Sequence, residues 1–326
     1  MRKPLSWSAF ALVAALAFAA VLVRLPYYSI GPGPAREVEP LIHVEGPERY
    51  PSAGRFVMTT IEYRQLTALG ALLAWIDPDQ RIVEESVLFP GGETHEEEQR
   101  RSISEMDQSK IDATSVALRE LGIYPKRHGS GALIRGVVPG CSAEGELYPG
   151  DLIVSVNGEP IDDAPQAGRV IEAIPSGRAL SFEVRPLGES TSEDVRLVRR
   201  PCGGEDRPLV GVSMTDSFPY DISIESGDVG GPSAGLMWAL GLYDLLTPGD
   251  LTGGRTIAGT GVISAGGRVG PIGGIEEKVV AADHVGADIL VVPKGNIEAA
   301  RGVDAPGARL VPVRSFDDAL AFLERD

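Results

Sequence analysis

The sequence predicts a mixed α/β (α+β) protein with one N-terminal transmembrane helix and a small β-rich module in its middle. Three observations lead to this fold class. Residues 7–23 form an uncharged apolar stretch, Asn157-Gly158 is a strong signal for a two-residue hairpin, and helical and strand patterns alternate over the last third of the 326 residues. A chain of this length has room for two or three domains.

The apolar stretch lies directly behind a basic N-terminus. Arg2 and Lys3 precede it, and it is slightly shorter than the ~20 residues that span a bilayer core. The basic start predicts a cytoplasmic N-terminus and a body on the extracytoplasmic side. An Ala-Phe-Ala sequence at residues 17–19 leaves a cleaved signal peptide open as the alternative to an uncleaved single-pass anchor, which we favour.

The region behind the anchor predicts a linker followed by strand and helix. Residues 29–52 are punctuated by Gly and Pro, residues 55–62 are strand-like, and residues 65–76 have a helical pattern. Thr94 and Glu97 form a capping box that opens a long, heavily charged helix. We expect the charges of this helix to form a solvated face rather than a site.

The middle module contains the hairpin signal. Strands are expected at residues 132–138, 179–184 and 193–198, and a helix at 166–173. The pattern V-x-x-x-S-A-x-x-x-L-x-x-G-D-x-I-x-x-V-N-G over residues 138–158 resembles the PDZ domains of bacterial secreted proteases. Such domains bind extended peptides or C-termini by adding a strand to a sheet edge. The resemblance implies a carboxylate loop at residues 128–131 and a peptide site formed by Gly129, Ser130, Gly131 and Ala132. The alternative is a scaffold without a peptide ligand.

The last third alternates helices with strands. Strands are expected at residues 209–214, 288–292 and 309–313, and Ser315 is expected to cap a final helix at residues 316–324. Within this region Gly230, Gly231 and Pro232 predict a tight turn, after which Ser233 opens an apolar helix. A serine at a helix N-terminus sits among unpaired backbone N–H groups, where a developing oxyanion would be stabilised.

A second helix in this region carries a lysine on its apolar face. Ile275, Lys278, Val279 and Ala282 fall at i, i+3, i+4 and i+7, so Lys278 takes a core-side position. Burial lowers the pKa of a lysine, and a neutral amine can act as a general base near neutral pH. Together with Ser233 it could form a Ser-Lys dyad.

These two motifs also carry a resemblance. GGPSAG followed by TGxI and GxVxPIGGIEEK resembles the proteolytic domain of the Lon peptidases. The resemblance implies that Ser233 is the nucleophile, that Lys278 is its base and that Thr260 helps to hold the lysine. Gly231 and Ala234 are the neighbouring residues expected to support the site. The chain departs from the family at Gly230, where Lon enzymes usually have an acidic residue.

Three alternatives stay open. The GPSAG sequence is also a GxSxG pattern, as in α/β-hydrolases, which would require His284 instead of the lysine. Lys278 could be an ordinary surface lysine. The absent acidic residue at Gly230 favours a peptide-binding scaffold with a latent or inactive peptidase domain.

Composition and motif content exclude several classes of binding partner. A formal net charge of −16 argues against nucleic acid, because a phosphate backbone requires a basic face. No GxxxxGK[ST], HExxH or paired CxxC motif occurs, so we expect no ATP site, no metal and no cofactor. Cys141 and Cys202 could pair in an oxidising compartment or remain free thiols.

The whole chain resembles the membrane-anchored, PDZ-containing Lon-like peptidases of bacteria. The resemblance implies an ATP-independent serine endopeptidase that cleaves exposed or unfolded polypeptides outside the cytoplasmic membrane, and it leaves a homo-oligomer open. We expect an anchor at residues 1–28, a linker and α/β region at 29–122, a PDZ-like domain at 123–200 and the proteolytic domain at 201–326.

Overall fold

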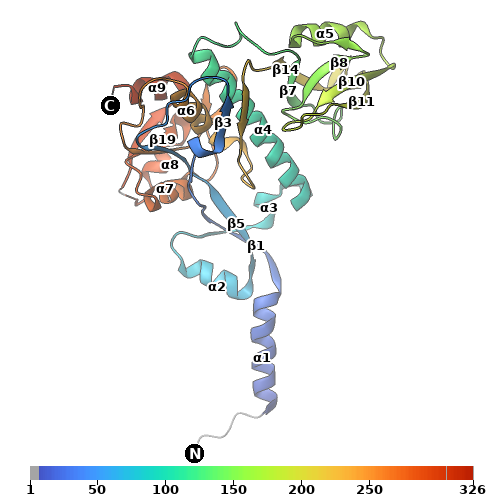
Figure 1. Cartoon of the computed structure of the whole chain (residues 1–326). Helices are drawn as coiled ribbons and strands as arrows, with labels where there is room; N and C mark the ends of the chain where they lie inside the picture. Colours follow the sequence, from blue (N-terminus) through green and yellow to red (C-terminus); the bar gives the residue numbers. More distant parts are fainter. Residues whose placement is uncertain (1–6, 306, 326) are drawn as a thin grey trace, which may run out of the picture.

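The computed structural model describes residues 7–305 and 307–325. Its first element, α1 (Trp7–Leu22), is a 16-residue helix that projects away from the body (Figure 1). The helix ends just before Arg24, which begins β1 (Arg24–Pro32). Within the described residues, no helix has the length and apolar character needed to cross a membrane. Arg2 and Lys3, on which the expected orientation depended, lie outside the described residues.

A three-stranded antiparallel sheet lies next to α1. Its order is β5–β1–β6, with β5 at Ile61–Thr67 and β6 at Arg81–Glu84. Between these strands the chain forms α2 (Ala68–Ile76), and α3 (Glu85–Leu88) and the short turn η2 (Pro90–Gly92) follow. The helix expected at residues 65–76 therefore starts three residues later than predicted, because the Thr67 side chain caps it by accepting a hydrogen bond from the Gly70 N–H.

The central sheet of the body has the order β2–β4–β16–β19–β20. Its strands are β2 (Arg36–Glu37), β4 (Arg55–Met58), β16 (Thr256–Gly259), β19 (Ile289–Pro293) and β20 (Arg309–Val313). The last four are parallel, and β2 adds an antiparallel edge. The strands expected at residues 288–292 and 309–313 are confirmed within one residue.

Helices cover both faces of this sheet. One face packs against α4 (His95–Glu120), α6 (Gly235–Leu245) and α9 (Phe316–Leu323), and the other against α7 (Ile275–His284) and α8 (Ile297–Arg301). Residues that alternate along one strand separate the two cores: Val291 lies in the first and Leu290 in the second. Ser315 caps α9, as predicted. The remaining short elements are η1 (Glu39–Leu41), β3 (Ile42–Glu45), β15 (Asp221–Ile224), β17 (Val262–Ile263), β18 (Val269–Gly270) and η4 (Lys294–Asn296).

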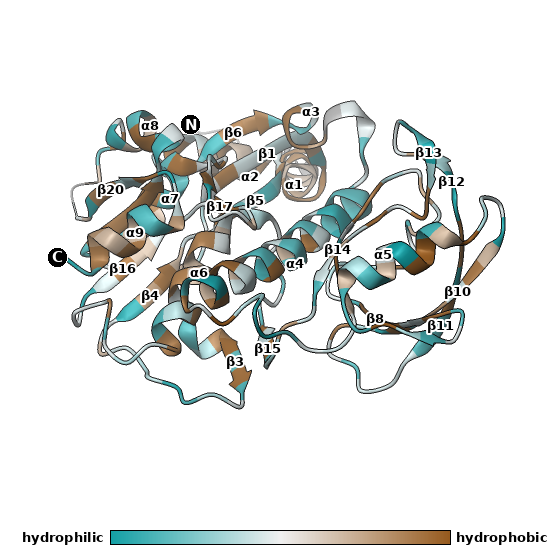
Figure 2. Cartoon of the chain, turned by 90° about the horizontal axis from the view of Figure 1, so that it is seen from above, coloured by the Kyte–Doolittle hydropathy of each residue, from teal (hydrophilic) through white to brown (hydrophobic). Residues whose placement is uncertain are grey.

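The β-rich module forms a second unit with its own core. Its sheet has the order β11–β10–β8–β7–β14, and α5 (Ala164–Ala173) contacts β7, β8 and β14. Figure 2 shows α5 next to β8 and β14. The strands are β7 (Ala132–Val137), β8 (Leu152–Val156), β9 (Glu159–Pro160), β10 (Ala179–Arg185), β11 (Glu193–Val198) and β14 (Val212–Asp216). Cys141 and Cys202 form a disulfide, which ties the loop after β7 to the hairpin of β12 (Arg200–Cys202) and β13 (Glu205–Leu209).

The packing cuts across the expected domain boundaries. Strand β4, from the expected region 29–122, joins the central sheet, and β14, from the expected proteolytic region 201–326, joins the β-rich sheet. Helix α4 crosses between the two units (Figure 2), and its Asp112 pairs with Arg135 of β7 at 2.9 Å. Pairings between strands so distant along the chain leave no local sequence signal, which is why the boundaries expected from composition do not follow the packing.

Candidate active site

Ser233 lies at the entrance of α6, but not in its first helical turn. It occupies a short 3₁₀ turn, η3 (Pro232–Ala234), and α6 begins at Gly235. Gly231 precedes the turn with φ of +79°, a conformation that favours glycine. The predicted turn is therefore confirmed, while the helix begins two residues later than expected. The Ser233 side chain is half-buried and lies in the wall of a cleft.

Lys278 lies on α7, which covers the face of the central sheet opposite to α6, and its side chain reaches Ser233. Its Nζ lies 2.6 Å from the Ser233 Oγ and 3.0 Å from the Thr260 Oγ1. The lysine is 2% exposed, which rules out an ordinary surface lysine. Burial lowers the pKa of Lys278 to about 8. Among the described residues it has no carboxylate partner in an ion pair that would restore the charged form.

Thr260 orients the lysine amine. Its Oγ1 donates its one hydrogen bond to the Ser233 carbonyl oxygen at 3.0 Å, so toward the lysine it can only accept a hydrogen bond from Nζ. When Lys278 is neutral, this arrangement leaves the lone pair of its nitrogen available to the Ser233 Oγ. The Gly261 N–H also donates to the Ser233 carbonyl, at 2.7 Å, so the backbone beneath the serine is held from two positions.

His284 takes no part in this group. It ends α7 with its imidazole 3.9 Å from Asp79 and mostly exposed to solvent. The residues that line the cleft do not include it. The α/β-hydrolase interpretation, which requires a histidine next to the serine, is therefore wrong.

The cleft in front of Ser233 has a volume of about 800 Å³. Its walls come from β1 and β5, from the Val229–Ala234 region, from α7 and from the N-terminal half of α4. Ile30, Ile61 and Met106 make part of the wall apolar. Such a cleft has space for several side chains of an extended polypeptide.

Helix α4 is the part of the site that the sequence analysis missed. Arg101, Ser102, Glu105 and Met106 all line the cleft, although we expected this charged stretch to be only a solvated face. The capping box at Thr94 and Glu97 is confirmed. Small and apolar residues in its second half, including Ala113 and Ala117, pack against α6 and so bring the first half over the serine.

Contact with α4 explains the glycine at position 230. A Cβ atom there would clash with the Ser102 Oγ. The Gly231 N–H donates to the Ser102 carbonyl at 2.8 Å, so this N–H is already occupied. Gly230, where Lon enzymes usually have an acidic residue, was therefore the one signal in the sequence that α4 lies against the turn before Ser233.

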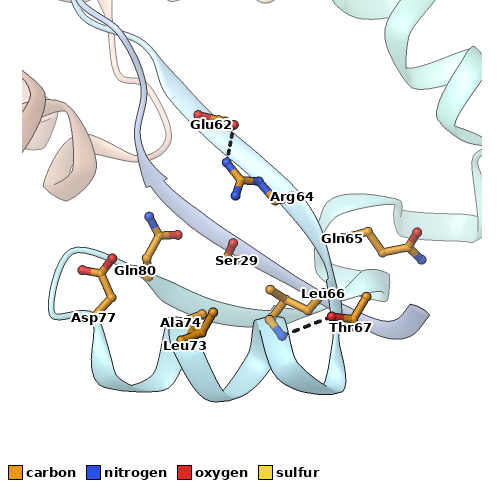
Figure 3. A pocket seen from close by; sticks show the side chains of 11 residues that line it. Ser29, Glu62, Arg64, Gln65, Leu66, Thr67, Leu73, Ala74, Asp77 and Gln80 are labelled. Carbon is orange, nitrogen blue, oxygen red and sulfur yellow. Dashed lines mark hydrogen bonds and ion pairs between the residues drawn. The ribbon is translucent and has the colours of Figure 1, made fainter. Parts of the chain in front are cut away.

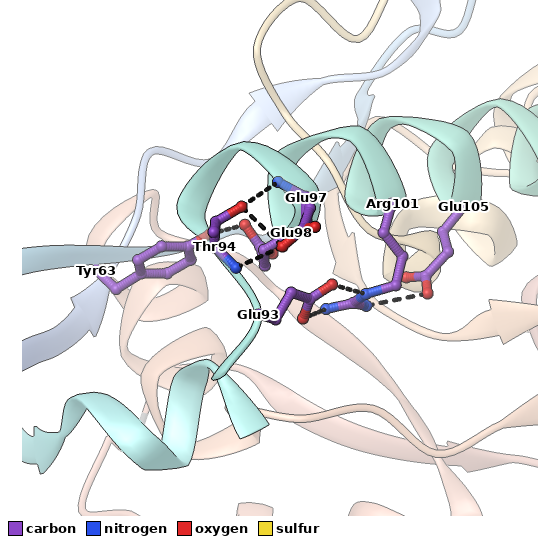
Figure 4. Close-up of polar contacts among 7 residues, drawn as sticks. All are labelled: Tyr63, Glu93, Thr94, Glu97, Glu98, Arg101 and Glu105. Atoms are coloured by element: carbon purple, nitrogen blue, oxygen red, sulfur yellow. Dashed lines mark hydrogen bonds and ion pairs between the residues drawn. The ribbon is translucent and has the colours of Figure 1, made fainter. Parts of the chain in front are cut away.

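The rim of the cleft is rich in charged groups that pair with one another (Figure 4). Arg101 lies 3.0 Å from a Glu93 oxygen and 3.2 Å from a Glu105 oxygen. Tyr63 on β5 donates to Glu98 on α4 at 3.1 Å, and its desolvation, reinforced by Glu98, raises the pKa of Tyr63 to about 12. These contacts join the β5 wall and the α4 wall.

The predicted peptide site of the β-rich unit does not lie on a free edge. Ala132 belongs to β7, which has β8 on one side and β14 on the other. The Gly129 N–H donates to the Ser217 carbonyl, and the Ser130 carbonyl accepts from the Ser217 hydroxyl, so the backbone just before Gly131 is already paired. Within the described residues the sheet ends at β11 and at β14, and β14 is the edge strand beside α5.

Comparisons with known proteins match both units. Residues 220–308 match the family described as "Lon protease (S16) C-terminal proteolytic domain", and residues 133–186 match the PDZ domain family. Lon protease 2 of Bacillus subtilis is 34% identical over 141 residues, which are 43% of this chain and 23% of that protein. The Lon protease of Roseiflexus castenholzii is 44% identical over 113 residues, 34% of this chain and 14% of that protein.

Among solved structures, the PDZ domain of the SdrC-like protein of Listeria monocytogenes covers 26% of this chain and 87% of its own, with 18% identity and a TM-score of 0.24. The alignments to the curated relatives span less than a quarter of the length of those proteins. The matched segments include Ser233, Thr260 and Lys278. The chain thus carries a Lon-type S16 proteolytic domain and a PDZ domain.

Proposed function

We propose that the protein is an ATP-independent serine endopeptidase that uses Ser233 and Lys278 as a dyad. The observation that carries this proposal is the 2.6 Å contact between the Ser233 Oγ and a lysine amine that is buried without a carboxylate partner among the described residues. A Lon-type proteolytic domain implies serine peptidase chemistry, and this pair supplies the two groups that such chemistry requires.

Each residue has a defined role in the reaction. Neutral Lys278 takes the Ser233 proton while the Oγ attacks the peptide carbonyl, and the resulting ammonium then protonates the leaving amine. In the second half of the reaction, water attacks the acyl-enzyme while it gives a proton to the same amine, and the ammonium returns that proton to the Ser233 Oγ as the acyl group leaves. The oxyanion requires backbone N–H donors near the serine; Pro232 has none and the Gly231 N–H is occupied, so Ala234 is our candidate donor.

The PDZ domain would present the substrate. An extended peptide would add to β14, beside α5, rather than to the residues expected from the sequence. Substrates on this proposal are exposed or unfolded polypeptides.

We also propose that the protein is attached to a cytoplasmic membrane through α1, with its body on the extracytoplasmic side. Two observations support this location. Apolar side chains are exposed on all sides of α1, including Phe10, Leu16 and Phe18. The Cys141–Cys202 disulfide is the kind of bond that persists in an oxidising compartment.

A peptide-binding scaffold with a latent peptidase domain is the second candidate. The observation that favours it is the bond from the Gly231 N–H to the Ser102 carbonyl, because it removes one N–H from the neighbourhood of the serine. On this alternative α4 would have to move before the enzyme could act.

The test is cleavage of casein and of a fluorogenic peptide without ATP. Wild type is compared with Ser233→Ala, Lys278→Ala and the matched control Lys294→Ala, which removes an exposed lysine. We expect the first two variants to lose activity by about 10³-fold or more and the control to keep it. Activity that survives Lys278→Ala would refute the dyad, and an inactive wild type would favour the scaffold.

A further inference from the structure

Exposed apolar side chains are concentrated at one end of the molecule. Within the described residues, most of the exposed large apolar side chains lie on α1 or on α2, although the chain as a whole is strongly acidic. Exposed apolar residues that gather in one place mark an interaction surface, whereas scattered ones do not.

The apolar stripe of α2 faces solvent, whereas the apolar stripe of a helix in a soluble protein normally faces the core. Leu69, Leu72, Leu73 and Ile76 stand at i, i+3, i+4 and i+7, the spacing that normally faces a core, yet each is more than 40% exposed. Trp75 is 77% exposed, the highest value among the large apolar side chains that the structure describes. Of the α2 side chains, only Ala74 is buried.

The opposite side of α2 has different chemistry. There Ala74 lines a small pocket beneath β1 and β5, together with the polar side chains of Asp77 and Gln80, and Leu73, at the border of the apolar stripe, also lines it (Figure 3). Residues 66–76 themselves contain no charged side chain. One side of α2 therefore faces polar groups of the body. The other side is uncharged and apolar, and nothing in the described part of the chain covers it.

The position of α2 identifies what covers that face. Helix α2 contacts α1 and lies beside the end of α1 that faces the body (Figure 1). Any membrane that takes up α1 would therefore meet α2 at its surface. Tryptophan and aliphatic side chains on an uncharged helix are the chemistry of the bilayer interface.

We propose that α2 lies in the interfacial layer of the lipid bilayer, with the face formed by Leu69, Leu72, Trp75 and Ile76 toward the acyl chains. This inference rests on the proposed membrane attachment through α1. It adds a second contact, which prevents the body from rotating freely about a single helix.

The second contact fixes the height of the active site. Strand β5 begins in the cleft, where Ile61 and Tyr63 line the wall, and ends at Thr67, the cap of α2. Six residue steps of about 3.3 Å give roughly 20 Å between the cleft wall and the helix cap. The enzyme would therefore act on polypeptide segments close to the membrane surface.

The test uses the fluorescence of Trp75 in the full-length protein. The chain has three tryptophans, Trp7, Trp75 and Trp238, and Trp238 is buried in α6. A Trp7→Phe variant is reconstituted into phosphatidylcholine–phosphatidylglycerol vesicles with and without lipids brominated on the acyl chains. We expect brominated lipid to reduce the Trp75 emission at least twofold and aqueous iodide to have little effect. Quenching by iodide but not by brominated lipid would overturn the proposal.

The reciprocal variant separates this proposal from the one on which it rests. In Trp75→Phe, quenching of Trp7 by brominated lipid reports insertion of α1; its absence would overturn attachment and the α2 contact together. If brominated lipid quenches Trp7 in Trp75→Phe, but neither quencher reaches Trp75 in Trp7→Phe, a second copy of the chain covers α2, and the proposal is overturned. A Leu72→Glu/Ile76→Glu variant should expose Trp75 to iodide and still cleave a soluble peptide at the wild-type rate, so a loss of catalysis is recognised separately.

Discussion

Replacing Lys278 by methionine should abolish cleavage and change how the stability of the catalytic unit depends on pH. The pKa of Lys278 falls from 10.5 to about 8 because the amine is buried. Between these two values the unfolded chain carries a proton that the folded protein does not, so stability rises with pH across this window. Below about pH 8 the folded protein must bury the charge, and the full energetic cost is present.

The magnitude follows from the two pKa values. For a lysine that titrates at 10.5 when unfolded and near 8 when folded, the free energy of unfolding increases by about 2.5 kcal/mol between pH 7 and pH 10. Methionine has a similar volume and no titratable group. Lys278→Met should lack this increase, although it also loses the two hydrogen bonds to Ser233 and Thr260, worth about 1 kcal/mol each.

The assay is urea unfolding at pH 7 and pH 10, followed by the emission of Trp238, which is buried in the catalytic unit. The comparison uses the pH-dependent difference between wild type and variant, because other titrating groups contribute equally to both. If the two proteins gain or lose stability in parallel between these pH values, the amine is not desolvated and the reasoning is refuted.

The remaining predictions concern catalysis. Cleavage by wild type should rise about tenfold per pH unit below pH 8 and then level off, since only neutral Lys278 accepts a proton, and a profile flat from pH 6 to 9 would contradict this. Thr260→Val should lower kcat by about 10- to 100-fold with KM little changed, and Thr260→Ser should restore it, because the hydroxyl orients the amine. Gly230→Asp should inactivate the enzyme by displacing α4, whereas Gly273→Ala, which adds a methyl group into open space in the same cleft, should not; equal rates would show that the Ser102 contact is unimportant. Peptides tethered to vesicles should be cut fastest at sites roughly 20 Å from the bilayer, and no dependence on tether length would argue against a fixed height.

Much of the local structure could be predicted from the residues. The capping box at Thr94 and the cap at Ser315 mark helix starts because a side-chain oxygen satisfies a backbone N–H within three residues. The buried position of Lys278 followed from the helical spacing of its apolar neighbours. Each of these features depends on contacts between residues close together in the chain.

The parts that could not be predicted depend on contacts over long distances. Nothing near Ala132 indicates that β14 would pair with β7 and form an edge of the sheet, so the predicted peptide site lies beside an interior strand. Nothing in the charged pattern of α4 indicates that Ser102 would touch Gly230, because that contact depends on how the second half of the helix packs against α6.

The sequence by itself determined the chemistry of this protein: a serine after a glycine turn, a lysine on an apolar helical face and the motifs that resemble Lon enzymes and PDZ domains. The tertiary structure decided what surrounds that chemistry. It brought the Lys278 amine to 2.6 Å from the Ser233 Oγ, placed α4 over the turn and left the apolar stripe of α2 uncovered. The physical reason is that short-range patterns specify which side chains a local element presents, while burial and the pKa values that depend on it arise only when distant elements pack together.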